Sequence, residues 1–429
     1  MTAPFLSFAR RRARPAPVLH DRLVRTAGPL IVTTGLNGLL GVVYWVVAAR
    51  LYDQVTVATN MAVIAAMTTL SGVSQLNLGP SLGVLVPRAG ERARRVVLEV
   101  YAVVTAYAVV ALTVFFGFVL PHLTRLSDVL GSTSRMLLFA VAVLAFNIFA
   151  LQDAALASLR RAGMIPFENG LFGVVKIILL FALVGSLPEF GIFTSWLLPM
   201  LVIVPMVSAY IFLRRSDRGR STLAPTTTRD SVPKLALDYL GYLFQVSSTF
   251  FLPVVALELL EPVSASVFAV AWLTSSTIDL LATNVGTALT VETSYGESPA
   301  ALRRTILRRA MPLVAVVTAV GLLLAPLILR LYGSEYSAGG LHTLQILLLA
   351  GMPRCLVTFA IAESRAHRNI KTIVWLRAQN AALALGLSFL LTPRFGVEGM
   401  ALAWLVAQLL GAATALQLVW RKRVSPLES

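Results

Sequence analysis

Five ionisable side chains lie inside stretches of the chain that are otherwise almost entirely apolar. Three of them are cations, Lys176, Arg354 and Arg377, and two are carboxylates, Asp153 and Asp279. An ionised side chain in hydrocarbon costs roughly 2.5–3.5 kcal/mol on insertion scales unless it is paired or hydrated. Cations at such depth suit the binding of an anionic group such as a pyrophosphate, whereas carboxylates can carry a proton or a sodium ion. The cations are therefore candidate substrate-binding residues, and the carboxylates are candidate ion-coupling residues.

A structural role is an open alternative for each of these charges. Lys176 or Arg354 can pair with Asp153 or Asp279 inside the protein and hold helices together without binding a ligand. Arg377 lies nearer the end of its apolar segment, so its long side chain can reach the membrane surface. Lys176 and Arg354 lie about ten and thirteen residues from the start of their apolar segments. At a helical rise of about 1.5 Å per residue, both lie near the middle of the membrane. These two residues are therefore the stronger candidates for substrate binding.

Composition assigns the chain to the helical membrane proteins. Of its 429 residues, 57% are hydrophobic and 13% are charged, about half the charged fraction of a typical soluble protein. The apolar residues come in blocks of about 20, long enough to cross a hydrocarbon core of about 30 Å. The sequence thus predicts an all-α polytopic membrane protein.

Several kinds of chemistry lack a motif in the sequence. The single cysteine, Cys355, cannot form a disulfide within the chain, and the four histidines have no spacing typical of a metal site. The phosphate-binding pattern GxxxxGK[ST] is also missing. We therefore predict no enzyme activity, cofactor or metal, and expect any driving force to come from a proton or sodium gradient or from consumption of the product.

Apolar windows predict twelve transmembrane helices. The first follows the basic start FARRRARP and is too long for a signal peptide, so we predict that it is retained. The segment after the second helix, NLGPSLGVLVPRAG, is expected to be interrupted or partly re-entrant. The predicted spans are 28–50, 56–78, 97–120, 135–159, 167–187, 191–213, 235–259, 262–288, 307–331, 341–363, 371–391 and 396–420.

The positions of the basic residues agree with this count and predict the orientation. With the N-terminus in the cytoplasm, most of the 36 Lys and Arg residues fall in inner segments. The outer loops then hold only Arg50, Arg125, Arg135, Arg330 and Arg394. Cytoplasmic loops carry an excess of Lys and Arg, so both termini are predicted to be cytoplasmic. The net charge of +16 follows from this topology and does not call for a nucleic-acid partner.

The spans form two sets of six with weak internal similarity. VVAARLYDQVTVA at 46–58 aligns with VVALELLEPVSAS at 254–266, and NLGPSL at 77–82 with NVGTAL at 284–289. Two six-helix halves in the same orientation predict a pseudo-two-fold axis along the membrane normal and a central cavity between them. The predicted segments are a basic N-terminal segment 1–26, a first half 27–213, a linker 214–234, a second half 235–420 and a tail 421–429.

The stretch LQDAALASLRRAGMIPFEN at 151–169 resembles a signature of the bacterial polysaccharide (oligosaccharide) flippase family, Wzx-like, of the multidrug/oligosaccharidyl-lipid/polysaccharide (MOP) exporter superfamily. Those proteins often read LQDxxLxxxRRA followed by PxEN. The resemblance continues in NGLLGVVYWVVAARLY from Asn37, in LNLGPSLGVLVPRAG and in GIFTSWLLP. In the second half it is carried by the span count and by DYLGYLFQ with FFLPVV.

Ordinary helix chemistry also accounts for much of this stretch. Arg160 and Arg161 anchor an inner loop, and Pro166 suits a first helical turn. Glu168 and Asn169 are expected to satisfy free amides at that helix N-terminus. Asp153 is not explained in this way.

The resemblance implies a transporter that flips a polyprenyl-pyrophosphate oligosaccharide or polysaccharide precursor across the bacterial cytoplasmic membrane by alternating access. Its expected partners are membrane lipids, the lipid-linked glycan, and a glycan polymerase or glycosyltransferases. One alternative is an ion-coupled drug or cation antiporter of the same superfamily, and another is a non-transporting scaffold for glycan assembly. A major-facilitator transporter ranks lower because VPRAGERARR at 86–95 lacks the aspartate of that family's loop.

Overall fold

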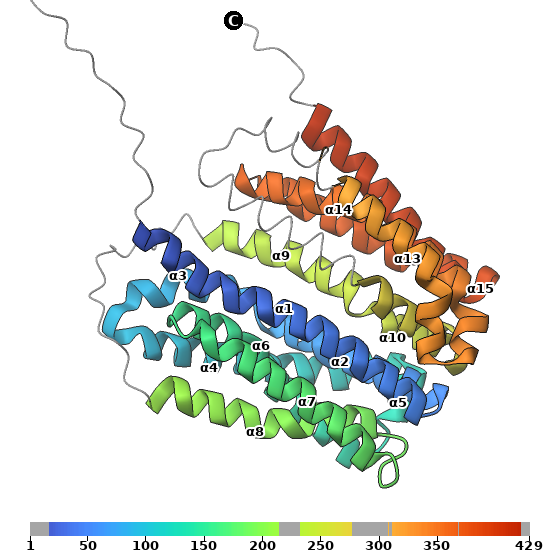
Figure 1. Ribbon diagram of the computed structural model, residues 1–429, viewed down its shortest axis with the longest axis horizontal. Helices are drawn as coiled ribbons and strands as arrows, with labels where there is room; N and C mark the ends of the chain where they lie inside the picture. The colour runs from blue at the N-terminus through green and yellow to red at the C-terminus, as the bar shows by residue number, and fades with distance from the viewer. Residues whose placement is uncertain (1–16, 214–231, 277–307, 309–310, 368, 422–429) are drawn as a thin grey trace, which may run out of the picture.

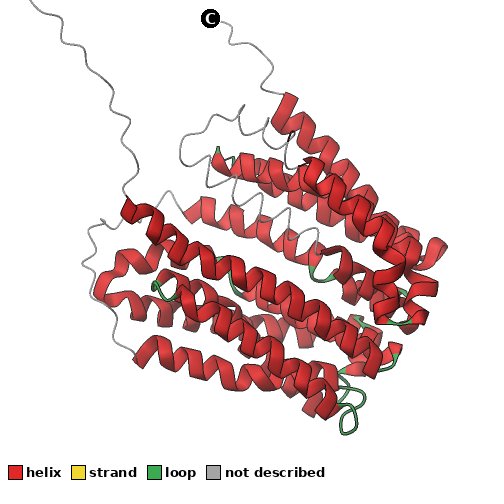
Figure 2. Ribbon diagram, viewed as in Figure 1, coloured by secondary structure: helices red, strands yellow, loops and turns green. Residues whose placement is uncertain are grey.

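The computed structural model describes residues 17–213, 232–276, 308, 311–367 and 369–421. These residues form helices joined by short turns, without a β-strand among them (Figure 2), which confirms the predicted all-α class. The main helices are α1 (Pro17–Leu51), α2 (Gln54–Ser74), α3 (Leu78–Ala89), α4 (Ala93–Val114), α5 (Thr124–Val129), α6 (Thr133–Ser158), α7 (Ile165–Leu183), α8 (Gly191–Leu213), α9 (Val232–Thr249), α10 (Leu252–Leu259), α13 (Met311–Tyr332), α14 (Ser334–Ala366) and α15 (Ile370–Ala415).

Within the described ranges, ten helical stretches are long and apolar enough to cross a membrane. The last of them, Ile370–Leu418, contains two helices, because Gly396 has the non-helical dihedrals φ 58° and ψ −135°. The eighth predicted span is described in part, as the shorter apolar helix Pro262–Ser276. The chain is therefore a multi-pass membrane protein whose helices follow the predicted spans.

The predicted interruption after the second span is present. Leu76 and Asn77 both have positive φ, at 51° and 55°, so the chain leaves the line of α2 before α3 begins. Pro87 lies within α3, and Gly90, with φ 54°, follows its end. Left-handed dihedrals at two consecutive non-glycine residues are uncommon, which accounts for the sharp turn.

The helices lie in two groups, which are coloured blue to green and yellow to red in Figure 1. Helices α1 to α8 pack chiefly on one another, and α9 to α15 do the same. Helices α9 and α10 also contact α2, and α13 contacts α1. The predicted linker 214–234 lies almost wholly outside the described residues.

Hydrogen bonds join the two groups at both ends of α2. Near its C-terminal end, Asn77 donates to Asp238 at 2.8 Å. Beyond its N-terminal end, the Arg50 side chain donates to the Leu331 carbonyl at 2.8 Å, and the main chain of Arg125 donates to Glu258 at 3.2 Å. Any separation of the groups at one end must break the bonds at that end.

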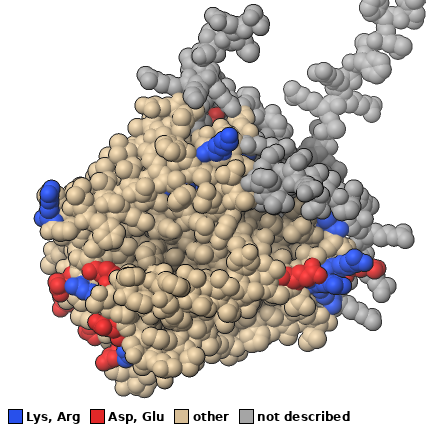
Figure 3. Space-filling model, turned by 180° about the vertical axis from the view of Figure 1, so that it is seen from behind, with Lys and Arg blue, Asp and Glu red and all other residues tan. Residues whose placement is uncertain are grey.

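Small residues allow close packing inside the first group. A Cβ at Gly173 of α7 would lie 2.5 Å from Leu40 Cδ1 of α1, and one at Gly170 would lie 3.0 Å from Leu36 Cδ2. Glycine at such contacts lets membrane helices approach closely. On the outside, one face of the molecule is apolar across its middle, with charged side chains gathered mainly toward its two ends (Figure 3), as expected for a surface that contacts lipid.

Candidate functional site

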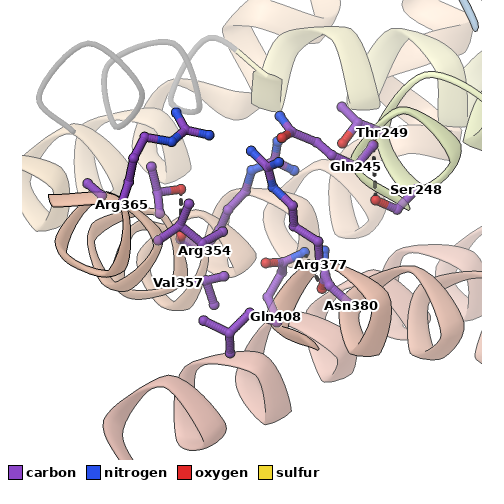
Figure 4. Close-up of a pocket in the computed structure, with 13 residues that line it drawn as sticks. Gln245, Ser248, Thr249, Arg354, Val357, Arg365, Arg377, Asn380 and Gln408 are labelled. Carbon is purple, nitrogen blue, oxygen red and sulfur yellow. Dashed lines mark hydrogen bonds between the residues drawn. The ribbon is translucent and has the colours of Figure 1, made fainter. Parts of the chain in front are cut away.

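A pocket of about 170 Å³ lies among α9, α14 and α15 (Figure 4). The side chains of Arg354 and Arg365 enter it from α14, and that of Arg377 enters from α15. The other described lining residues carry amide, hydroxyl or aliphatic groups and include no carboxylate: Gln245, Ser248, Thr249, Val357, Thr358, Ile361, Ala362, Leu376, Asn380 and Gln408. The lining is therefore cationic.

The three guanidinium groups have different surroundings. The Cζ of Arg354 lies 4.9 Å from the centroid of the Trp404 ring, within the range of a cation–π contact. Arg365 lies 3.8 Å from a carboxylate oxygen of Asp238, outside the lining. The Nε and Nη1 atoms of Arg377 are buried and have no hydrogen-bond partner among the described residues. Buried donors are normally satisfied, so Arg377 is ready to donate to a ligand.

The polar walls of the pocket suit a hydroxyl-bearing ligand. Gln408 donates to Asn380 at 3.0 Å, which fixes both amides beside the arginines. The Gln245 side chain projects from α9 toward the guanidinium groups (Figure 4). Amides can both donate and accept hydrogen bonds. The walls can therefore bind ligand hydroxyls beside the three cationic side chains.

Lys176, the third predicted cation, lies elsewhere. It is buried in the first group of helices, and its Nζ lies 4.6, 5.0 and 4.3 Å from the ring centroids of Tyr44, Phe172 and Trp196. The described residues include no carboxylate paired with it. The structure thus brings Arg354 and Arg377 together but leaves Lys176 apart, and the alternative pairing of Lys176 with Asp153 is not formed.

Asp153 lies in a polar cluster that joins three of the quoted motifs. Its carboxylate accepts a hydrogen bond from Asn169 Nδ2 at 2.9 Å, and Asn169 Oδ1 accepts one from Asn37 at 3.1 Å. Glu168 is fully buried beside this pair, and neither of its carboxyl oxygens has a hydrogen-bond partner within the described structure. The buried hydroxyl of Tyr101 is likewise unpartnered.

This arrangement corrects the expected role of Glu168 and Asn169. They were predicted to satisfy free amides at the start of α7, but Asn169 binds Asp153 and Asn37 instead. The Glu168 carboxyl makes no hydrogen bond to any described residue. Arg161 does anchor its loop, since it donates to the Tyr210 carbonyl at 2.9 Å and its Cζ lies 5.0 Å from the centroid of the Tyr210 ring.

Asp279 falls outside the described residues, so its predicted role in ion coupling stays a prediction and its alternative pairing with Lys176 or Arg354 stays open. The sequence reasoning missed Arg365 as a residue of the pocket, and it named Glu168 at the helix start but not its burial beside Asp153. A signal for Arg365 existed, because positions 354, 358, 361 and 365 repeat on one face of a helix with the period of 3.6 residues. For Glu168 the sequence carried no such signal. Its position at a helix start suggested a capping role, and its burial depends on the packing of other helices around it.

No protein-family model and no curated protein sequence matches the chain. Solved structures share its fold. An inward-facing multidrug resistance MATE family transporter of the MOP superfamily has a TM-score of 0.68 at 15% identity, covering 91% of this chain and 97% of that one. A MATE crystal structure in complex with MaL6 has a TM-score of 0.65 at 15% identity, covering 94% and 96%.

A third structure is a MOP superfamily transporter from Pyrococcus furiosus Vc1, with a TM-score of 0.61 at 17% identity, covering 94% of this chain and 95% of that one. Its description states that the reverse polarity of its binding pocket suggests a different function. These identities establish the fold alone. The chain has the fold of the MATE transporters of the MOP superfamily, which confirms the superfamily-level fold that the sequence motifs implied.

Proposed function

We propose that this protein flips a lipid-linked oligosaccharide or polysaccharide precursor across a bacterial cytoplasmic membrane, with the pyrophosphate of the polyprenyl carrier bound in the pocket of Arg354, Arg365 and Arg377. One observation carries the proposal. Among the described residues, three guanidinium groups enter a pocket that no carboxylate lines, and the buried Nε and Nη1 atoms of Arg377 have no hydrogen-bond partner.

The chemistry of the ligand matches that of the pocket. A pyrophosphate is a multiple anion with several oxygen acceptors, and arginine binds phosphates through parallel hydrogen bonds. Burying such an anion without compensation costs far more than thermal energy supplies. The arginines supply that compensation, and Gln245, Asn380 and Gln408 offer amides to the sugar hydroxyls. No covalent bond changes in this process, consistent with a transporter rather than an enzyme.

Alternating access requires the two groups of helices to separate at one end at a time. The Asn77–Asp238 bond lies at one end of the contact, and the Arg50 and Arg125 bonds lie at the other. Related folds have been solved in inward-facing and outward-facing conformations, with TM-scores of 0.68 and 0.62 to this chain. These observations support a rocking motion in which the two sets of bonds break in turn.

Ion coupling is assigned to Asp153 together with Glu168. An isolated carboxylate that is buried without a hydrogen bond is strongly disfavoured in its ionised form. We therefore assign to Glu168 the binding of a proton or of a cation such as sodium during transport. A second carboxyl, Asp153, lies close by, which favours exchange of one positive charge between the pair.

The flippase would act beside a glycan polymerase or glycosyltransferases.

The test compares ligands on the purified protein. The unfolding temperature in detergent should rise with a polyprenyl pyrophosphate, and rise far less with the neutral polyprenol or with a cationic drug. Arg354→Met and Arg377→Met should lose the response. Arg95→Met, at an exposed residue of α4 that pairs only with Glu99 in the described structure, should keep it. An equal response to the polyprenol and the pyrophosphate would contradict the proposal.

A second candidate is the ion-coupled drug or cation antiporter. The fold similarity to multidrug transporters favours it, as do the buried carboxyl groups of Asp153 and Glu168. Under that function, the cationic drug should raise the unfolding temperature, and Glu168→Gln should abolish the rise. The two candidates therefore give opposite ligand preferences in one experiment.

A further inference from the structure

The surroundings of Lys176 form an aromatic cage. Tyr44 of α1, Phe172 of α7 and Trp196 of α8 each present a ring within 5.0 Å of the lysine Nζ. Lys176 is only 7% exposed, and the described residues offer its ammonium neither an ion pair nor a hydrogen bond. Its charge is therefore held chiefly by the faces of three rings.

The cage is built from fixed parts. The Tyr44 hydroxyl lies 2.8 Å from Ser195 Oγ and donates to the Ile192 carbonyl at 3.0 Å. The Trp196 ring packs edge to face against Phe172, with centroids 5.7 Å apart and planes at 84°. It packs in the same way against Tyr44, at 6.1 Å and 78°. These contacts hold the rings in position whether or not a cation sits between them.

Aromatic cages of this kind recognise alkylammonium ions. Here the alkylammonium is the chain's own lysine, which is tethered and so has a high effective concentration at the site. A free cation can enter the cage only if the Lys176 side chain leaves it, and the described residues offer no carboxylate that pairs with the lysine.

We propose that the cage of Tyr44, Phe172 and Trp196 is an organic-cation site that Lys176 occupies permanently. Lys176 thereby determines specificity, because its side chain keeps organic cations out of the first group of helices. The inference holds whatever the pocket at Arg354 and Arg377 binds, because it depends on a separate set of residues.

The test uses a ligand that replaces the deleted atoms. Lys176→Ala removes three methylene groups and the ammonium, which together correspond to n-propylammonium. This ion should raise the unfolding temperature of Lys176→Ala by several degrees at millimolar concentrations. Sodium at equal ionic strength and 1-propanol should have little effect, and the unaltered protein should not respond. Lys176→Met refills the cage with an uncharged chain and should not respond either.

A second variant guards against failure of Lys176→Ala to fold. Lys176→Cys can be modified with 2-aminoethyl methanethiosulfonate, which restores an ammonium on a chain of similar length, while the native Cys355 is buried. This adduct should be more stable than the adduct with methyl methanethiosulfonate, which is neutral. The proposal is overturned if propylammonium and propanol act equally on Lys176→Ala, if the unaltered protein responds as strongly, or if both adducts are equally stable.

Discussion

Arg377→Met should weaken ligand binding without weakening the fold. Methionine keeps much of the length of the arginine side chain and removes the guanidinium. In the structure, Nε and Nη1 of Arg377 are buried without hydrogen-bond partners among the described residues. Functional sites commonly reduce the stability of the fold. Removing a side chain that serves a ligand should therefore weaken binding without lowering the free energy of unfolding.

The magnitudes follow from the unpaired donors. Each buried unsatisfied donor costs about 1–3 kcal/mol, and a hydrogen bond to a charged group contributes about 1.5–3 kcal/mol. The substitution should therefore leave the free energy of unfolding unchanged or raise it by about 1–3 kcal/mol. Loss of one charged hydrogen bond should weaken pyrophosphate binding roughly 10- to 100-fold.

Thermal unfolding and ligand titration on the same purified samples measure both effects. Arg95→Met is the matched control, since Arg95 is exposed and pairs with Glu99. It should change neither quantity, because surface ion pairs contribute about 0–1 kcal/mol. The reasoning would be refuted if Arg377→Met unfolds at a clearly lower temperature while its affinity for the pyrophosphate stays the same.

Three further substitutions test other parts of the structure. Glu168→Gln should fold at least as stably as the unaltered protein in thermal unfolding, because its carboxyl oxygens have no hydrogen-bond partners among the described residues. The substitution should remove any proton or sodium dependence of transport in liposomes. Asp53 accepts hydrogen bonds from Thr56 N and Oγ1 at 2.9 and 2.7 Å. Burial alone would raise the pKa of Asp53, but these hydrogen bonds hold it below its ordinary value of 3.8. Asp53→Ala should therefore cost about 0.5–2 kcal/mol at neutral pH, and unfolding measured at falling pH should show this difference shrinking below pH 3.8. Gly399→Ala places a Cβ against a facing main-chain carbonyl oxygen and should lower the unfolding temperature by several degrees, whereas Gly386→Ala, with nothing within 4 Å of its Cβ, should not.

Much of the fold was predictable because the membrane restricts the choices. A spanning segment must satisfy its own backbone hydrogen bonds, so long apolar stretches become helices. The predicted spans 191–213 and 235–259 match α8 and the helical stretch Ala236–Leu259 closely. Span 167–187 differs from α7 by a few residues at each end, because apolar composition alone does not specify where a helix begins or ends.

The sequence predicted which charged residues belong to candidate sites, but it did not predict which of them lie together in the folded protein. Arg354 and Arg377 were identified because charges are costly in apolar segments, and they line one pocket. Lys176 was identified by the same argument but lies in an aromatic cage, because its neighbours Tyr44 and Trp196 come from two other helices, α1 and α8. Hydropathy reports depth in the membrane, and it does not report which helix faces which.

The central claim is tested most directly by leaflet exchange in liposomes. Vesicles containing the protein and a fluorescent polyprenyl-pyrophosphate saccharide are treated with a membrane-impermeant quencher that reaches only the outer leaflet. The account predicts faster exchange than in protein-free vesicles, and a rate close to the protein-free one when Arg354 and Arg377 are both replaced by methionine. Exchange that stays at the protein-free rate with well-folded, unaltered protein, or that is unchanged by the double substitution, would contradict it.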